Sequence, residues 1–162
     1  MTADAGANEA AFRAWVDEAL AAADAGREAA FAVLRAGDGA AIGSTRYLSL
    51  RPEHRGLEIG YTWLARAAWG TGANAEAKLL LLRHAFERRG AMRVEFKTNA
   101  RNQRARKALE ALPARFEGIF RRHMVVQGGE VRDSAWYAIT DEEWPGVRTL
   151  LERRVETYAS GE

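Results

Sequence analysis

The segment WGTGANA, residues 69–75, combines two glycines with the predicted start of a helix. Gly70 and Gly72 lack a Cβ atom, so their backbone can adopt unusual φ angles and approach a ligand closely. The first N–H groups of a helix have no intrahelical partner, and the helix dipole adds partial positive charge there. Phosphate is the natural ligand of such an arrangement. The segment therefore predicts a phosphate-binding loop at residues 70–75.

Two common phosphate motifs do not fit this loop. The Walker motif needs four residues between its glycines, followed by Lys and Ser or Thr, and the segment has neither. The dinucleotide fingerprint needs a third glycine in the first βα unit of a parallel sheet, whereas this loop follows several predicted antiparallel strands. A Gly-Thr-Gly sequence alone also fits a tight turn that binds nothing, so the surrounding elements have to decide.

The elements beside the loop are a strand and an apolar helix. GLEIGYTWLA, residues 56–65, reads as the strand that enters the loop. The helix predicted at 74–89 contains four consecutive leucines at 79–82 and is hydrophobic almost all round. Such a helix is expected to be buried on several sides. Burial would hold its N-terminus in place for the ligand.

The rest of the chain reads as alternating helices and strands. A helix at 8–25 carries an apolar face at helical spacing, formed by Phe12, Trp15, Val16, Ala19, Leu20 and Ala23. Strands are expected at 29–35, 40–50, 91–99 and on both sides of Gly128-Gly129, which suit a two-residue hairpin turn. The strand at 91–99 alternates, with Met92, Val94, Phe96 and Thr98 on one face and Arg93, Glu95, Lys97 and Asn99 on the other. Helices are expected at 102–112, capped by Asn102, and near Pro145, where Thr140 and Glu143 have capping-box spacing. This order predicts an α/β or α+β sandwich around a mixed sheet.

Length and composition limit the possible classes of protein. The 162 residues fit one domain, 1–162, and the formal net charge of +2 does not indicate a nucleic-acid-binding surface. The absence of cysteine excludes disulfides and thiolate metal sites. No segment approaches the length of a membrane span, and the N-terminus has no signal-peptide pattern. We therefore expect a cytoplasmic protein without a metal, a membrane partner or a nucleic-acid partner.

The glycine loop resembles the acyl-CoA-binding motif of the GNAT superfamily of N-acetyltransferases. That motif reads Arg/Gln-x-x-Gly-x-Gly/Ala at a strand-to-helix junction, and Gly72 takes its central glycine. Trp69 stands where Arg or Gln is usual, and Asn74 where Gly or Ala is usual. The Trp-Gly variant, followed by Glu76-Ala77, is similar to the branch that contains ribosomal-protein N-terminal acetyltransferases.

Three further segments extend the resemblance over about residues 28–145. They are LEIGYTWL before the loop, RVEFKTNARNQRARKALEAL after the helix, and the closing hairpin FEGIFRRHMVVQGGEVRDSAWYAI. Ala105 departs from a serine often found three residues after the asparagine, which removes a hydroxyl. The family usually begins with a strand and a helix before the helix predicted at 8–25. Either the N-terminus is truncated or the sheet lacks that strand.

The resemblance implies a GNAT-like fold and an activity. The fold would be a mixed, mostly antiparallel twisted sheet with helices on both faces, without the family's first strand and helix. The activity would be transfer of an acetyl group from acetyl-CoA to a primary amine, either a protein N-terminus or a small amine. The diphosphate would lie on residues 70–75 and the pantetheine arm along the end of the strand. The implied cofactor-binding residues are Trp63, Leu64, Trp69, Gly70, Thr71, Gly72, Ala73, Asn74, Ala75 and Asn102.

Glu58 and Tyr61 are the catalytic candidates, because both lie on the strand that leads to the implied cofactor site. A carboxylate can take the proton of the attacking amine, directly or through water. Glu58 could equally be a solvent-facing carboxylate paired with Arg46 or Arg93. Tyr61 could act as the acid or belong to the core.

Several other residues have two interpretations each. His54 and His123 have suitable basicity near neutral pH, but His123 also fits a hairpin surface. Arg101, Arg104, Arg106 and Lys107 could engage the 3′-phosphate of CoA or form a solvated helix face. Trp136 and Tyr137 could line the acceptor pocket, but neighbours on a strand face opposite ways, so one of them must point into the core.

Other classes of function remain open from the sequence. A non-catalytic acyl-CoA-binding or regulatory domain would be consistent with Ala105. A nucleic-acid-binding module would rest on the arginine-rich segment 101–107, against the near-neutral net charge. A homodimer is compatible with the sequence.

Overall fold

A computed structural model describes residues 7–160, apart from the side chains of Gln127 and Ala159. The helices are α1 (Glu9–Asp24), α2 (Ala73–Arg83), α3 (Gln103–Glu110) and α4 (Trp144–Ser160). The strands are β1 (Ala29–Leu34), β2 (Ala41–Arg51), β3 (Gly56–Leu64), β4 (Arg93–Asn99), β5 (Arg115–Val125) and β6 (Val131–Thr140). Short turns η1 (Pro52–His54), η2 (Arg66–Ala68) and η4 (Gln127–Gly129) are 3₁₀-helical, and η3 (His84–Arg88) is a π-helical turn that extends α2.

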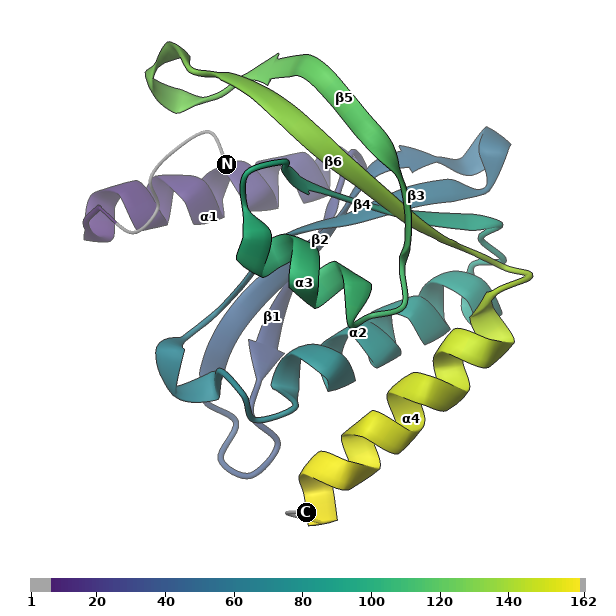
Figure 1. The fold of residues 1–162 in the computed structure, drawn as a ribbon. Helices are drawn as coiled ribbons and strands as arrows, with labels where there is room; N and C mark the ends of the chain where they lie inside the picture. Colours follow the sequence, from purple (N-terminus) through teal and green to yellow (C-terminus); the bar gives the residue numbers. More distant parts are fainter. Residues whose placement is uncertain (1–6, 161–162) are drawn as a thin grey trace.

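The strands form one sheet in the order β1-β2-β3-β4-β6-β5. The β3–β4 pair is parallel and the other pairs are antiparallel. Figure 1 shows α2, α3 and α4 on one face of the sheet and α1 on the other. The predicted mixed, mostly antiparallel sheet with helices on both faces is therefore confirmed. Within residues 7–160 no strand precedes α1, and β1 lies at one edge of the sheet.

The main core lies between the sheet and helices α2 and α4. In β4 the predicted alternation is confirmed, because Val94 and Phe96 are buried in this core while Arg93, Glu95 and Lys97 lie on the other face. Tyr137 and Ile139 of β6 join the same cluster.

Helix α1 buries a narrower stripe than its sequence predicts. Asn8 caps the helix by accepting a hydrogen bond from the N–H of Ala11 at 2.9 Å. Trp15 and Ala19 are buried as expected, but Phe12 and Leu20 are exposed. The apolar face is therefore only partly covered by the sheet.

Helix α2 departs from the prediction that it is buried nearly all round. Leu79, Leu81 and Leu82 are buried, but Leu80 is 57% exposed. Conversely, the one lysine of the helix, Lys78, is buried. The helix therefore has one solvent-facing side, and its buried side contains a cation.

The β5–β6 hairpin also departs from expectation. The predicted two-residue turn is wrong, because β5 ends at Val125 and β6 begins at Val131. Gly128 and Gly129 both have the positive φ angles that the prediction required, 82° and 77°. At the end of β6 the predicted capping box is confirmed, since Glu143 accepts a hydrogen bond from the N–H of Thr140 at 2.9 Å.

Candidate active site

Strands β3 and β4 separate halfway along β3. Their parallel pairing covers three positions, from Gly56 opposite Arg93 to Glu58 opposite Glu95. Beyond this point β3 pairs only with β2, up to Leu64, while β4 pairs with β6. The second half of β3 therefore has a backbone edge that no strand of residues 7–160 occupies.

A bulge redirects β3 where this free edge begins. The register between β2 and β3 shifts between Ser44 and Arg46, and Tyr61 has a φ of +49°. An extra residue in one strand bends it and breaks its pairing locally. After the bulge, Tyr61 lies against Trp15 of α1 instead of joining Leu57 and Ile59 in the core, and Thr62 bonds to Lys78 of α2.

A cavity of about 710 Å³ opens along this free edge. That volume is typical of small-molecule sites. The second half of β3, the glycine loop, the start of α2, and parts of α3 and α4 form its wall. Every predicted site residue lines it except Thr71 and Ala73. The lining residues among the predicted set are Glu58, Tyr61, Trp63, Leu64, Trp69, Gly70, Gly72, Asn74, Ala75 and Asn102.

The glycine loop leaves the N-terminus of α2 without a side-chain cap. Gly70 and Gly72 have φ angles of 76° and 81°, which explains the need for glycine at both positions. The Thr71 hydroxyl donates to the carbonyl of Ala68 at 2.8 Å. The side chain of Thr71 is thus used within the loop itself.

Trp69 fixes the loop to its neighbours. Its indole N–H donates to the carbonyl of Leu64, the last residue of β3, at 2.8 Å. The guanidinium of Arg104 lies 3.6 Å from the centre of the Trp69 ring, a cation–π contact. The predicted cap of α3 is confirmed, because Asn102 accepts from the N–H of Ala105 at 3.0 Å. The starts of α2 and α3 therefore meet at one end of the cavity.

The basic residues of segment 101–107 do not form one patch. Arg104 lines the cavity. In contrast, Arg106 donates to the hydroxyl of Tyr137 at 3.0 Å, and Arg101 pairs with Glu130 at 3.6 Å. Only Arg104 is placed to meet a ligand of this cavity among the three arginines.

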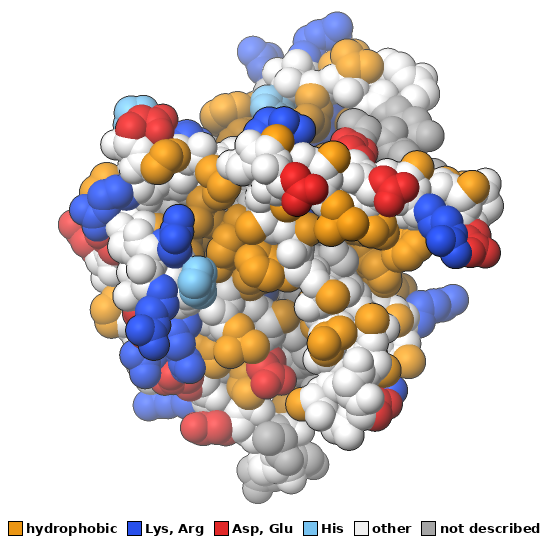
Figure 2. All heavy atoms as spheres, turned by 180° about the vertical axis from the view of Figure 1, so that it is seen from behind, with side chains coloured by type: hydrophobic (Ala, Val, Ile, Leu, Met, Phe, Trp, Pro, Cys, Tyr) orange, Lys and Arg blue, Asp and Glu red, His pale blue; other side chains and the backbone are white. Residues whose placement is uncertain are grey.

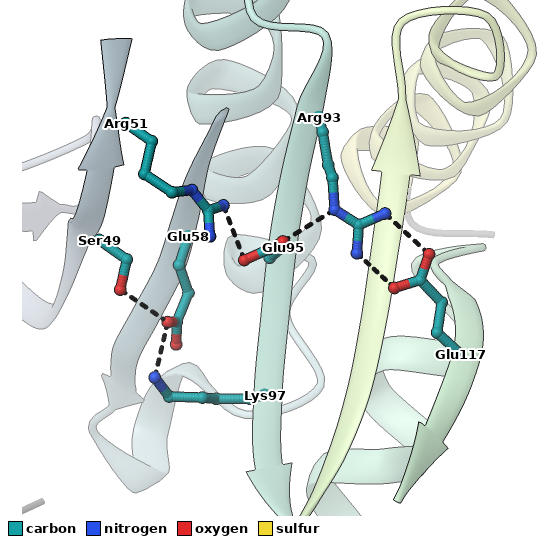
Figure 3. Close-up of polar contacts among 7 residues, drawn as sticks. All are labelled: Ser49, Arg51, Glu58, Arg93, Glu95, Lys97 and Glu117. Atoms are coloured by element: carbon teal, nitrogen blue, oxygen red, sulfur yellow. Dashed lines mark hydrogen bonds and ion pairs between the residues drawn. The ribbon is translucent and has the colours of Figure 1, made fainter. Parts of the chain in front are cut away.

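Glu58 is almost fully buried at the last paired position of β3. Lys97 lies 2.8 Å from its carboxylate, and Ser49 donates to it at 3.3 Å (Figure 3). The alternative partners expected from the sequence, Arg46 and Arg93, are wrong. Arg46 pairs with Glu28 at 3.1 Å.

The other carboxylates on this face are held by arginine (Figure 3). Glu95 pairs with Arg51 and with Arg93, at 2.8 Å each. Arg93 also forms a bidentate ion pair with Glu117 and lowers the pKa of the Glu117 carboxyl. These ion pairs link β2, β4 and β5 to one another, whereas Glu58 is the carboxylate that faces the cavity.

Tyr61 lines the cavity but also packs against protein. Its ring lies 4.5 Å from the guanidinium of Arg46, edge-on to Trp15. Burial raises the pKa of the Tyr61 hydroxyl. The phenol therefore stays protonated at neutral pH.

The β5–β6 hairpin carries an aromatic cluster outside the cavity wall, which neither Trp136 nor Tyr137 lines. Trp136 stacks on Phe120, and His123 lies edge-on to the same indole. Tyr137 points into the core, so the expectation that one of this pair is buried is confirmed. A ring nitrogen of His123 lies 3.0 Å from the Ser134 hydroxyl, and burial lowers the pKa of the His123 imidazole. Figure 2 shows hydrophobic side chains gathered across the middle of the face opposite α2 to α4.

His54 lies in the exposed turn η1 and does not line the cavity. Sequence reasoning missed four basic residues of the cavity wall, Lys78, Lys97, Arg132 and Arg154. The alternation of β4 already placed Lys97 on the face of Glu95, but nothing in the sequence indicated its pairing with Glu58. Lys78 was concealed by the apolar residues around it.

Comparison with known proteins decides the family. Residues 3–115 match the model of the acetyltransferase (GNAT) domain. The chain belongs to the GNAT acetyltransferase family. A candidate acetyltransferase from T. thermophilus is 41% identical, with a TM-score of 0.82 over 91% of this chain and 75% of that one. A GCN5-related N-acetyltransferase from Brucella melitensis is 32% identical, with a TM-score of 0.84 over 92% of this chain and 66% of that one.

The predicted branch also occurs among the relatives of this acetyltransferase. Mycobacterium smegmatis RimJ in complex with CoA-disulfide is 26% identical, with a TM-score of 0.74 over 89% of this chain and 68% of that chain. No curated protein sequence matches the chain. GNAT acetyltransferases use acetyl-CoA as cosubstrate and transfer its acetyl group to an amine.

The acetyltransferase shows neither a metal cluster nor a membrane helix in the part of the chain that the structure describes. No group of three or more His, Asp or Glu side chains in that part is placed to hold a metal ion. No helix of residues 7–160 is long and apolar enough to span a membrane.

Proposed function

We propose that this acetyltransferase transfers the acetyl group of acetyl-CoA to a primary amine in the gap between β3 and β4. One observation carries the proposal. The pairing of β3 with β4 ends at a buried carboxylate, and from there a cavity runs to an uncapped helix N-terminus. This arrangement offers an amide cluster for a diphosphate, a free strand edge for an extended chain, and a base.

The nucleotide end of acetyl-CoA fits the glycine loop. Its diphosphate would accept hydrogen bonds from the N–H groups of residues 70–75, which the helix dipole favours. Thr71 and Ala73 contribute through their backbone only, in keeping with their absence from the cavity wall. Arg104 and Asn102 at the start of α3 would lie beside the nucleotide, with Arg104 as the partner of the 3′-phosphate.

The pantetheine arm fits the free edge of β3 near Trp63 and Leu64. An extended chain with amide groups can pair with an open strand edge as an added strand would. Trp69 contributes by tying the end of β3 to the glycine loop. The thioester would then lie near Glu58, where the two strands converge.

Glu58 would act as the base and Tyr61 as the acid. The neutral amine nitrogen attacks the thioester carbon, a C–N bond forms, and the C–S bond breaks. Glu58 takes the proton of the amine, directly or through water, and the thiolate receives a proton from the Tyr61 hydroxyl. Ala105 supplies no hydroxyl for this second step.

The acceptor would approach from the face that carries Trp136 and His123. A flat aromatic wall beside a carboxylate suits the apolar part and the amine of either a protein N-terminus or a small amine. Both acceptor classes belong in the test.

The test measures thiol release from acetyl-CoA with a panel of N-terminal peptides and small amines. We expect amine-dependent release of CoA together with the acetylated amine, identified by mass spectrometry. Tight CoA binding without thiol release for any amine would instead support the non-catalytic acyl-CoA-binding domain, which the family assignment does not favour. Steeply salt-dependent binding to DNA or RNA would indicate the nucleic-acid-binding alternative.

A further inference from the structure

Lys78 is a buried cation whose contacts are hydroxyl groups. It projects from α2 into the cavity wall and is 5% exposed. Its ammonium lies 2.6 Å from the Thr62 hydroxyl and 3.4 Å from the Thr45 hydroxyl. No ion pair joins it to a carboxylate of residues 7–160. Burying an unpaired charge is costly, so the position of Lys78 calls for an explanation other than packing.

The two threonines mark the bulge of β3. Their hydroxyls lie 2.8 Å apart, and the Thr45 hydroxyl reaches the carbonyl of Gly60 at 3.4 Å. The register of β2 against β3 shifts at this place. One side chain of α2 therefore connects both strands at the point where β3 leaves β4. Burial lowers the pKa of Lys78 to about 7.

A second buried cation holds the bulge from the other face. Arg46 is 2% exposed, and its guanidinium lies 4.3 Å from the Trp15 ring and 4.5 Å from the Tyr61 ring. Tyr61 and Thr62 are neighbours in the bulge, and each contacts one of the two cations. A non-glycine residue at positive φ, such as Tyr61, persists only where its surroundings hold it.

We propose that Lys78 is a positioning residue for acetyl transfer. By donating to the Thr62 hydroxyl it holds the bulge of β3, and with it the free edge along which the pantetheine arm lies. Lys78 acts through Thr62 rather than on the reacting atoms. The inference rests on the proposed function, because Lys78 can position acetyl-CoA only if acetyl-CoA binds along the free edge of β3.

The test compares Lys78→Met and Thr62→Val with the wild type. Methionine keeps the length of the side chain without the charge, and valine keeps the β-branch without the hydroxyl. We expect each variant to raise the KM for acetyl-CoA and the Kd for CoA about tenfold, the size of one lost charged hydrogen bond. The double variant should be no worse than either single one, because both remove the same bond. Thr62→Ser, which retains the hydroxyl, should restore the wild-type KM.

A purely structural lysine gives a different result. Replacing an unpaired buried charge by methionine would then raise the melting temperature and leave the KM and Kd unchanged, which would overturn the proposal. Hydrogen exchange adds a readout that does not depend on turnover: we expect faster exchange at the amides of residues 61–64 in Lys78→Met. If Lys78→Met fails to fold, the Thr62→Val and Thr62→Ser pair decides alone. A wild type that binds no CoA would instead refute the proposed function, and this inference with it.

Discussion

The two halves of strand β3 differ in what surrounds their backbone. From Gly56 to Glu58 the strand is paired on both sides, with β2 and with β4. From Tyr61 to Leu64 it is paired with β2 alone, and the other edge faces the cavity. The closed half is part of an ordinary sheet, and its one charged residue, Glu58, pairs with Lys97 of β4. The open half carries the candidate site.

The difference between the halves shows how an interrupted sheet can contribute one wall of a binding site. A sheet edge inside a domain leaves unpaired N–H and C=O groups, which need partners. The bulge at Tyr61 creates such an edge, and two buried cations hold it. A ligand with its own amides can satisfy that edge, and in the proposed function the pantetheine arm does so.

The largest expected effect is a loss of kcat that distinguishes Glu58 from Glu95. These two residues lie opposite each other at the last paired position of β3 and β4. Glu58→Gln removes the proposed base, so kcat should fall about 10²- to 10⁴-fold with little change in the KM for acetyl-CoA. Glu95→Gln lies on the closed side and should keep its kcat while lowering the melting temperature, because Arg51 and Arg93 lose a partner. Stopped-flow or steady-state thiol release measures both. An unchanged kcat in Glu58→Gln would remove Glu58 from the mechanism.

The next effect compares glycines at the two ends of α2. Gly72→Ala must place a Cβ 2.7 Å from the Tyr158 ring at a φ of +81°, so the loop has to shift. Gly90→Ala has a similar φ, +63°, but open space around its Cβ. Both should lose about 1–2 kcal/mol of stability from the left-handed backbone.

Only Gly72→Ala should also weaken CoA binding. We expect its Kd for CoA to rise about tenfold, which corresponds to about 1.4 kcal/mol of lost binding free energy. Isothermal titration calorimetry with CoA checks this. Equal CoA affinities for the Gly72 and Gly90 variants would mean that the loop does not hold the diphosphate.

The third effect is a pH dependence of the unfolding free energy, which arises from Lys78 beside the open half of β3. Burial lowers the pKa of Lys78 to about 7 from the usual 10.5. Between these values the unfolded chain binds a proton that the folded chain does not, so stability should rise with pH in this window. Below pH 7 the full cost of the buried charge is present.

Lys78→Met should remove this dependence. The unfolding free energy of the wild type, relative to the variant, should grow by up to ~1.4 kcal/mol per pH unit between pH 7 and 10. Chemical denaturation at several pH values gives the two curves, with the exposed Lys107→Met as control. Parallel curves for wild type and Lys78→Met would show that Lys78 titrates as a solvated lysine does.

The smallest effect compares two helix caps. Asn8 caps α1 and Asn102 caps α3 by the same hydrogen bond, at 2.9 and 3.0 Å. Asn8→Ala and Asn102→Ala should each cost about 1 kcal/mol, measured as a lower melting temperature. Only Asn102→Ala should weaken CoA binding, because α3 borders the cavity and α1 does not. If neither variant changes the affinity, Asn102 is a cap and nothing more.

The closed parts of the molecule could be predicted from the sequence. Alternation along β4, the capping box at Thr140 and the cap at Asn102 follow local rules, and each is confirmed. The two glycines of the loop at 70–72 were interpretable for the same reason, since their positive φ is a property of the backbone itself. The family resemblance then placed these segments in order.

The parts that escaped prediction depend on contacts between distant segments. Gly60 precedes the bulge at Tyr61, and a glycine inside a strand can mark a bulge. The side on which the bulge places Tyr61 and Thr62 depends on contacts with α1 and α2, which lie far away in the sequence. Nothing in the sequence marks the buried contacts of Lys78, because its partners lie 16 and 33 residues away. Glu58 was expected beside Arg46 or Arg93, and Lys97 is the partner because pairing of β3 with β4 places it there.

The central claim is that acetyl-CoA binds along the open edge of β3 with its diphosphate on the start of α2. A crystal structure of the protein with CoA tests it most directly. The account predicts the diphosphate within hydrogen-bonding distance of the N–H groups of residues 70–75, and the pantetheine arm between β3 and β4 beside Trp63. A ligand bound elsewhere, with this gap left to solvent, would contradict the account.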